Sequence, residues 1–282
     1  SGTYNLLVTN ASNCSVSSSN SIAVTVNPKP ALPTVNISGP TSFCQGGSVE
    51  LSVSSTPGYE YQWENSGSGI TGAIFNSYSA TTSGNYILRI TNSYGCSTKT
   101  ENVAVTVATS PAAPLIVAAG SQIFCQGDSV ELSISPTSGY NYQWKLNGGT
   151  IGANNHLLNA KSAGTYSLTV ANSIGCSANS TNTVDISVKT KPSLPSVNLS
   201  GPTSFCQGSS VDLSVNSSAG YQYEWENNGA AISGATSNKL TASTSGVYAI
   251  KITNSDNCFV RSENVTVNVL TVPSPPSISS AS

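Results

Sequence analysis

Residues 42–52 read SFCQGGSVELS, and nearly the same stretch returns as IFCQGDSVELS at 123–133 and as SFCQGSSVDLS at 204–214. After the glycine, apolar and polar side chains alternate in every copy, which is the period-two pattern of a half-buried β-strand. The copies begin at Ser42, Ile123 and Ser204, and are therefore evenly spaced. The stretch predicts one strand, and the turn before it, in a structural unit that the chain repeats.

The rest of the unit repeats with the same spacing. An aromatic segment such as GYEYQW follows each copy and ends at a tryptophan: Trp63, Trp144 and Trp225. A longer segment such as SGNYILRITNSYGC then ends at a cysteine: Cys96, Cys176 and Cys258. Pro-x-x-Pro openings return with the same even step: Pro30, Pro111, Pro192 and Pro273. A period of about 80 residues is too long for a solenoid repeat and predicts a small self-contained domain.

These landmarks predict three complete domains and two partial ones. The complete repeats are expected at 29–109, 110–190 and 191–272, with the start of another at 273–282. Residues 1–28 match the last third of a repeat, its F and G strands. Because two strands alone are marginal in water, this segment is expected to pack on something else. Two packing partners are possible for residues 1–28. One is an earlier part of a longer array, which we favour, and the other is a neighbouring chain.

The charge of the chain limits its partners. Of its 282 residues, ten are Lys or Arg, twelve are Asp or Glu and one is His, so the charged fraction is 8% and the net charge −2. Nucleic acid and anionic lipid are bound by many lysines and arginines, which this chain does not have. No run approaches the 18 apolar residues of a membrane-spanning helix. We therefore expect no nucleic-acid partner and no membrane insertion.

About seven short strands per unit, separated by turns rich in Gly, Pro and Asn, predict an all-β fold of antiparallel sandwiches. The order G-x-S-V-x-L, Y-x-W and S-G-x-Y-x-L resembles the immunoglobulin (Ig)-like fold. More specifically, it resembles the tandem Ig-like or PKD-like repeats of secreted surface proteins and adhesins from Bacteroidota-type bacteria, which are commonly type IX secretion cargo. The resemblance extends over the whole chain. It implies Ig-like sandwiches arranged head to tail in an extracellular protein, either secreted or held at the cell surface.

The resemblance also implies the core of each unit. Ig-like folds bury a tryptophan between the sheets and place a hydrogen-bonded tyrosine near the start of strand F. Core roles are therefore assigned to two sets of residues: Trp63, Trp144 and Trp225, and Tyr86, Tyr166 and Tyr248. Apolar side chains such as Val53 and Leu88 occupy the positions of the inter-sheet disulfide of true Ig domains.

Seven cysteines with repeating spacing predict disulfides and an oxidising, extracellular environment. Pairing within units would give Cys44–Cys96, Cys125–Cys176 and Cys206–Cys258. In the expected fold, however, Cys125 precedes strand B, and Cys176 lies in the F–G turn at the opposite end. Ten residues of strand separate those ends by about 30 Å, whereas a disulfide requires Cα atoms within about 7 Å.

Pairing between consecutive domains is therefore favoured, although pairing within units, free thiols and pairing between chains remain open. It would join Cys44 to Cys176 and Cys125 to Cys258. The other cysteines would then pair outside the chain: Cys14, Cys96 and Cys206.

No residue pattern indicates chemistry. His156 is the single histidine, and Cys-x-x-Cys pairs are absent, so a zinc site lacks ligands. We expect no catalytic residues, no metal, no cofactor and no enzyme activity. One group of residues is a candidate for ligand binding. The Tyr-x-Tyr-x-Trp stripe is predicted to be mainly core, with its outermost tyrosines as candidates for contact with a ligand such as a sugar: Tyr59, Tyr140 and Tyr221.

The predicted function is a non-enzymatic structural segment of a repetitive extracellular surface protein, either the stalk of an adhesin or a filament of disulfide-stabilised Ig-like domains. Its partners would be neighbouring repeats of the same chain, with identical chains in a filament and surface glycans as open alternatives. The alternative function is a set of carbohydrate- or ligand-binding Ig-like modules attached to a secreted enzyme.

Overall fold

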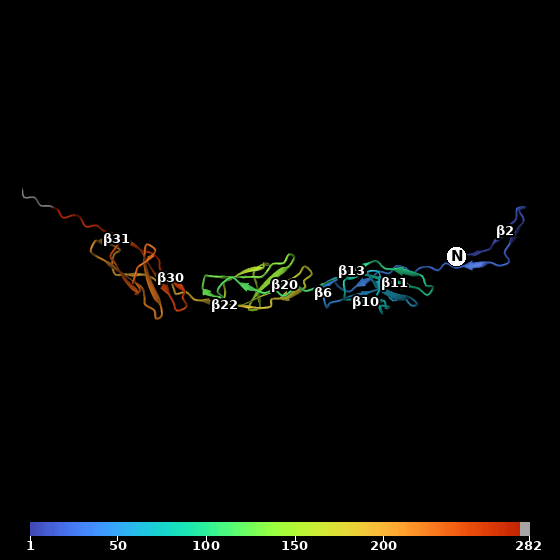
Figure 1. Ribbon diagram of the computed structural model, residues 1–282, viewed down its shortest axis with the longest axis horizontal. Helices are drawn as coiled ribbons and strands as arrows, with labels where there is room; N and C mark the ends of the chain where they lie inside the picture. Colours follow the sequence, from blue (N-terminus) through green and yellow to red (C-terminus); the bar gives the residue numbers. More distant parts are fainter. Residues whose placement is uncertain (277–282) are drawn as a thin grey trace, which may run out of the picture. The chain divides into compact units, whose positions relative to one another are not determined.

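The structure is a computed structural model that describes residues 1–276, and the regular elements in that range are all β-strands (Figure 1). Three tandem Ig-like β-sandwiches account for most of the chain, so the predicted fold class is confirmed. Each sandwich has nine strands where about seven were expected. The additional strands are short. Some belong to tight hairpins, and others arise because the first strand of each unit is divided between the two sheets.

The strands of the first sandwich are β5 (Asn36–Ile37), β6 (Ser42–Cys44), β7 (Val49–Ser52), β8 (Glu60–Asn65), β9 (Ser68–Gly69), β10 (Ser77–Ala80), β11 (Gly84–Thr91), β12 (Ser97–Lys99) and β13 (Val103–Ala108). Those of the second are β14 (Val117–Ala118), β15 (Ile123–Cys125), β16 (Val130–Ser133), β17 (Asn141–Leu146), β18 (Gly149–Ile151), β19 (Leu157–Ala160), β20 (Gly164–Ala171), β21 (Ser177–Asn179) and β22 (Val184–Lys189). Those of the third are β23 (Asn198–Leu199), β24 (Ser204–Cys206), β25 (Val211–Ser214), β26 (Gln222–Asn227), β27 (Ala230–Ala231), β28 (Lys239–Ala242), β29 (Gly246–Thr253), β30 (Phe259–Arg261) and β31 (Val265–Leu270).

Each sandwich packs a sheet of three strands on a sheet of six. In the first, the small sheet has the order β10-β7-β5, and the large one has the order β6-β13-β11-β8-β9 with β12 also paired to β11. The other two sandwiches repeat this arrangement. The first strand of the unit changes sheets, because β5 pairs antiparallel with β7 whereas β6 pairs in parallel with β13. This parallel pair places Cys44 in register with Ala108, where β13 ends.

The Cys-Gln-Gly sequence ends β6 and turns the chain toward β7. Gly46 has φ = 93°, a left-handed conformation that glycine adopts without the steric penalty of a side chain. The amide of Gly47 donates to the carbonyl of Cys44 at 2.9 Å and closes the turn. The turn thereby fixes the cysteine at the end of its strand.

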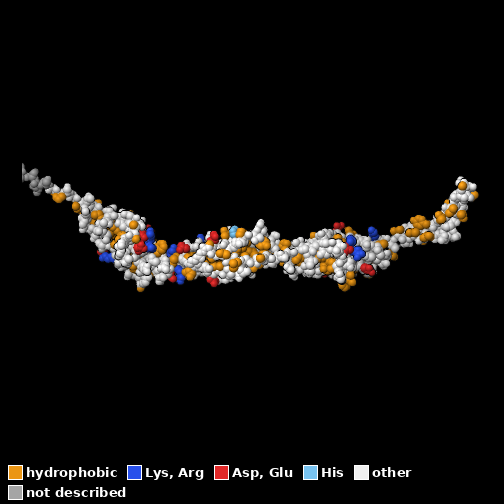
Figure 2. All heavy atoms as spheres, in the orientation of Figure 1, with side chains coloured by type: hydrophobic (Ala, Val, Ile, Leu, Met, Phe, Trp, Pro, Cys, Tyr) orange, Lys and Arg blue, Asp and Glu red, His pale blue; other side chains and the backbone are white. Residues whose placement is uncertain are grey.

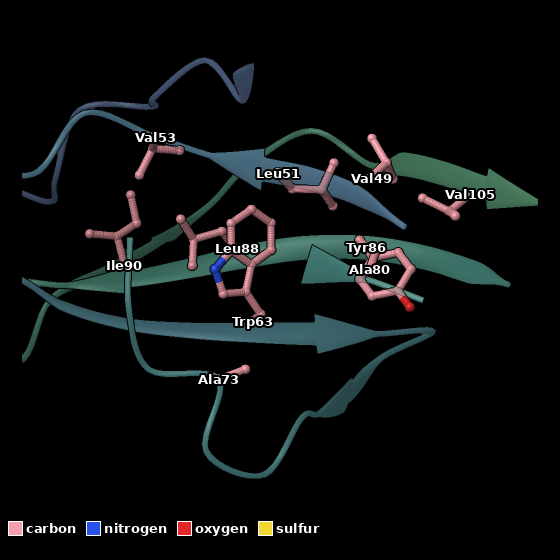
Figure 3. Packing of buried hydrophobic residues seen from close by; sticks show 10 residues of the cluster. All are labelled: Val49, Leu51, Val53, Trp63, Ala73, Ala80, Tyr86, Leu88, Ile90 and Val105. Atoms are coloured by element: carbon pink, nitrogen blue, oxygen red, sulfur yellow. The ribbon is translucent and has the colours of Figure 1, made fainter. Parts of the chain in front are cut away.

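The core of the first sandwich lies between its two sheets, around Trp63 (Figure 3). The indole is fully buried, and its N–H donates to the carbonyl of Phe75 at 3.1 Å. Tyr86 is also buried, and its hydroxyl donates to the carbonyl of Thr82 at 2.9 Å. Both polar atoms are therefore satisfied inside an apolar core, as buried aromatic residues require. The equivalent aromatic residues of the other sandwiches are likewise buried: Trp144, Trp225, Tyr166 and Tyr248.

The N-terminal segment has strand pairing but no core. Strand β1 (Gly2–Tyr4) pairs with β4 (Ile22–Val24), and β2 (Leu7–Thr9) pairs with β3 (Ser15–Ser17). All four strands are exposed on both faces. Tyr4 is 63% exposed, whereas Tyr86, which follows the same S-G-x-Y pattern in the first sandwich, is 1% exposed. The assignment of residues 1–28 to F and G strands remains a prediction.

Contacts divide the chain into two compact units. One comprises residues 1–113, 137–142 and 169–179, and the other comprises 114–136, 143–168 and 180–282. The boundary passes through the second sandwich, whose residues around Cys176 belong to the first unit. The predicted start of a repeat at 273–282 lies mostly outside the described residues, which end at 276.

Removing part of one core should destabilise one sandwich. Leu132 is fully buried in β16, so Leu132→Ala is expected to lower the stability of the second sandwich by about 2–5 kcal/mol. Hydrogen exchange followed by mass spectrometry measures this, with the first and third sandwiches as internal references. Leu115→Ala, at a residue 61% exposed, is the control and should change protection by less than about 0.5 kcal/mol. Equal loss of protection for both variants would contradict this description of the core.

Candidate functional site at the disulfides

Two disulfides connect cysteines of consecutive sandwiches. The first joint is Cys44–Cys176, with Cα atoms 5.5 Å apart, and the second joint is Cys125–Cys258, with Cα atoms 5.6 Å apart. Each joins the end of the strand that changes sheets to the turn that precedes a short hairpin strand of the following sandwich, β21 or β30. Pairs within one sandwich are not formed among the described residues. Each joint lies inside one of the two compact units.

The turn that presents Cys176 is organised by Asn172. The side-chain oxygen of Asn172 accepts hydrogen bonds from the amides of Ile174 and Cys176, at 3.1 and 3.0 Å. The backbone closes the same turn, because the Asn172 amide donates to the Cys176 carbonyl at 3.0 Å. Gly175 takes the left-handed conformation that the turn requires, with φ = 95°. The asparagine therefore holds the cysteine backbone in one position.

The same asparagine also binds the segment that enters its own sandwich. The side-chain amide of Asn172 donates to the carbonyl of Thr109 at 3.0 Å, immediately after β13 ends at Ala108. In the third sandwich Asn254 donates to the carbonyl of Thr190 at 2.8 Å. In the first, Asn92 donates to the carbonyl of Pro28 at 2.9 Å. One asparagine thus fixes both the cysteine and the incoming chain.

The other cysteine of the first joint is positioned by the parallel strand pair. The carbonyl of Ala108 accepts from the amide of Gln45 at 2.9 Å, which anchors the chain directly after Cys44. The Cys176 sulfur lies 3.8 Å from the same carbonyl. The carbonyl of Ala108 is therefore common to both sides of the joint. The second joint repeats the arrangement around Lys189, whose carbonyl is 4.0 Å from the Cys258 sulfur.

The two joints differ in charge. In the second, the Lys189 ammonium lies 3.2 Å from the Asp256 carboxylate, and the two side chains are 40% and 42% exposed. An exposed pair of this kind contributes at most about 1 kcal/mol. In the first joint, Ala108 and Ile174 occupy the corresponding places, and neither carries a charge. The ion pair therefore supplements a joint that is built from backbone and sulfur.

Burial protects one sulfur of each joint. Cys176 and Cys258 are 1% and 0% exposed, whereas Cys44 and Cys125 are half-buried. The bridged residues are 132 and 133 positions apart in the sequence. Closing a loop of that length is worth about 5 kcal/mol in the chain-entropy treatment of disulfides. The joints are therefore positioned to stabilise the fold as well as to connect sandwiches.

Three cysteines carry no disulfide in the structure: Cys14, Cys96 and Cys206. Cys96 lies in a turn like that of Cys176, held by Asn92 at 3.0 Å, and its sulfur is 3.7 Å from the carbonyl of Asn27. Cys206 is exposed at the end of β24, in parallel register with Leu270. Cys14 lies in the same kind of turn, where its amide donates to the side-chain oxygen of Asn10 at 3.0 Å, but it is exposed. None of the three has a second sulfur from residues 1–276 beside it. Their pairing outside the chain remains a prediction.

The cysteine spacing indicated pairing between domains, but the role of the asparagines was not predicted. A signal was available, since Asn stands four residues before the cysteine in every copy: Asn10, Asn92, Asn172 and Asn254. A side chain that binds the backbone two to four residues later is typical of asparagine turns. The hydrogen bond of Asn172 to Thr109 could not be inferred in the same way, because it joins groups 63 residues apart.

The tyrosines considered for ligand contact are half-buried in all three copies: Tyr59, Tyr140 and Tyr221. Tyr59 lines a hollow of about 470 Å³ with Tyr61, Ile74 and Arg89. An equivalent hollow of about 570 Å³ contains Tyr221. Figure 2 shows how sparse the charged side chains are on the face in view. Among residues 1–276, no group of three His, Cys, Asp or Glu side chains could hold a metal ion, and no helix is long and apolar enough to span a membrane.

Comparison with known proteins identifies Ig-like domains. A family model described as "Ig-like domain CHU_C associated" matches residues 30–109. No curated protein matches the chain.

Several solved structures are similar to the chain. A titin fragment of three Ig domains, I67–I69 in an E-to-A variant, is 14% identical, with 86% of this chain and all of that chain covered and a TM-score of 0.39. Murine CEACAM1b is 18% identical over 56% of this chain and all of its own, with a TM-score of 0.36. A Ca²⁺-stabilised adhesin from an Antarctic bacterium is 16% identical over 95% of this chain and 81% of its own, with a TM-score of 0.37. At such identities and TM-scores the likeness supports no assignment of a role to this chain.

Removing the turn asparagine should slow formation of one joint. Asn172→Ala abolishes the hydrogen bonds to Cys176 and Thr109, so the first joint is expected to form several-fold more slowly during oxidation of the reduced chain. The second joint should form at its normal rate. Alkylation of free thiols at timed intervals, followed by peptide mass spectrometry, measures both rates. Asn254→Ala is the matched control and should reverse the pattern, and slowing of both joints by either variant would contradict local positioning.

Proposed function

We propose that the chain is a non-enzymatic structural segment of an extracellular surface protein, in which disulfide joints hold consecutive Ig-like sandwiches together. The observation that supports this most strongly is the placement of Cys44–Cys176 and Cys125–Cys258 across consecutive sandwiches. A disulfide inside one domain stabilises that domain. A disulfide across two domains also restricts their relative movement, which is what a stalk or filament requires.

The proposed location is outside the cell. Disulfides persist in oxidising surroundings and are rare where cellular thiols keep cysteines reduced. The low charge supports a role that does not depend on ionic contacts, because contacts made by uncharged Ser, Thr and Asn depend little on salt concentration. The structural segment would belong either to the stalk of an adhesin or to a filament of identical chains.

The proposal predicts that the joints restrict motion between sandwiches. Fluorophores placed through non-natural amino acids at the exposed residues Ser68 and Ser233 would report the distance between the first and third sandwiches. The oxidised chain should give a narrow distribution of energy-transfer efficiencies. The variant Cys176→Ser/Cys258→Ser should give a broad one, since single hydrogen bonds such as Asn172–Thr109 are weak alone. Equal widths would show that the joints do not stiffen the array.

A second candidate function is ligand binding by the first sandwich, supported by a local departure from the repeat. Ile74 and Phe75 are 57% and 68% exposed, and Ile74 lines the hollow with Tyr59. The third sandwich has Thr236 and Ser237 at these positions. The hollow also contains polar side chains: Glu60, Gln62, Arg89 and Thr91. Aromatic and aliphatic carbons beside hydrogen-bonding groups suit the ring face and hydroxyls of a neutral sugar.

Saccharide binding is testable with neutral probes. Calorimetric titration with cellohexaose, xylohexaose and mannohexaose should give saturable binding of at least one at millimolar Kd or tighter. Ile74→Thr/Phe75→Ser, which reproduces the third sandwich, should weaken binding about tenfold. Thr236→Ile/Ser237→Phe is the matched control and should create a second site. Absence of binding to all three probes would exclude this function in favour of the structural one.

A further inference from the structure

The two disulfides close overlapping loops of the chain. The first joint links Cys44 to Cys176 and therefore bridges residues 45–175. The second links Cys125 to Cys258 and bridges residues 126–257. The two loops overlap, because Cys125 lies inside the first loop and Cys176 lies inside the second. The covalent connectivity of the oxidised chain is therefore not linear.

From this connectivity we infer the route that tension takes through the three sandwiches, on the proposed function of a load-bearing segment. The shortest covalent path enters at the first sandwich, reaches Cys44 and crosses to Cys176. It then runs backwards along the chain from Cys176 to Cys125, and crosses to Cys258. The second sandwich is thus loaded in the direction opposite to its sequence, and the flanking sandwiches are largely bypassed.

The length of this path follows from the positions of the cysteines. Between positions 29 and 272, the path comprises only the stretches 29–44, 125–176 and 258–272. These stretches amount to about 80 residues of extensible chain, whereas the reduced chain offers about 240 residues between the same positions. Two bypassed stretches make up the difference, 45–124 and 177–257. They cannot lengthen the oxidised chain even when they unfold.

The bypassed stretches and the loaded stretch contain different strands. In the first sandwich, β7 to β13 lie off the path, and in the third, β23 to β29 do so. In the second, β16 to β20 lie on it, together with the buried Trp144. Most of the core of the first and third sandwiches therefore lies off the covalent path, with β31 (Val265–Leu270) and its buried Val267 as the exception. The second sandwich carries most of the tension.

The two points at which the second sandwich is held lie at opposite ends of its large sheet. Cys125 is in register with Lys189, at the end of β22, and β22 pairs with β20 from Tyr166 to Gly164. Cys176 follows the other end of β20, just before β21. Tension between the two cysteines is directed along the strands. Many hydrogen bonds of the sheet are then loaded together, which is the arrangement that resists separation.

Single-molecule stretching of the full chain tests the route. Handles attached through non-natural amino acids at the exposed residues Lys29 and Val272 would define the ends. At about 3.5 Å per residue, the fully stretched oxidised chain should reach about 280 Å, and the reduced chain about 850 Å. An oxidised chain that extends as far as the reduced one would overturn the proposal.

Two matched variants test the contribution of each joint. Cys44→Ser/Cys176→Ser leaves only the second joint, and Cys125→Ser/Cys258→Ser leaves only the first. The extensible path becomes about 110 residues long in both variants, so each should extend to about 390 Å. Disulfides within sandwiches would instead give about 670 Å for the first variant, which would also overturn the proposal.

The stretching result is separable from the proposed function. Contour lengths depend only on which cysteines are bonded, whereas the proposed structural role depends on restricted motion between folded sandwiches. A broad energy-transfer distribution, combined with the contour lengths expected above for the oxidised, singly joined and reduced chains, would therefore retain the load route and reject the stiff segment. An oxidised chain that extends as far as the reduced one would reject the load route. A narrow distribution in that same chain would show that contacts other than the disulfides hold the sandwiches stiffly.

Discussion

The parallel pairing of β6 with β13 is the interaction on which the rest of the structure depends. It adds β6 as the edge strand of the large sheet in the first sandwich, and it places Cys44 beside the carbonyl of Ala108, the last residue of β13. The chain leaves the sandwich at that point, so the cysteine stands where the next sandwich begins. Because β15 and β22 repeat the pairing, the same geometry recurs at Cys125. A sulfur at the exit of one sandwich can meet a turn of the next, and a disulfide across domains becomes possible.

Much of this fold could be predicted from particular residues. Alternation in SVELS and the spacing from Cys44 to Trp63 indicated a repeated β-sandwich, because a half-buried strand and a central indole leave strong sequence patterns. The division of the first strand between two sheets could not be predicted. Strand β5 has two residues and β6 has three, which is too short for a periodic pattern. The small hairpin strand β9, formed by Ser68–Gly69, has no apolar side chain and left no signal either.

The pairing of the cysteines could be predicted in part, because the length of a strand determines which cysteines are close enough to form a disulfide. A strand of about ten residues holds its ends about 30 Å apart, and this distance disfavoured pairs such as Cys125–Cys176. The contacts that position the joints were not predictable, because Asn172 and Thr109 are brought together only by the folded arrangement. The exposure of Ile74 and Phe75 was likewise invisible in a sequence where apolar residues suggest a core. Features that depend on contacts between residues far apart in the sequence could therefore not be predicted, and they became visible only in the folded structure.

The joints are covalent bonds between consecutive sandwiches, and the disulfide map of the protein isolated from its native source tests them most directly. Digestion without reduction, followed by mass spectrometry, identifies each pair of linked peptides. We expect peptides that join Cys44 to Cys176 and Cys125 to Cys258. Peptides that join Cys125 to Cys176, or Cys44 to Cys96, would place the disulfides inside single sandwiches and contradict joints between consecutive sandwiches.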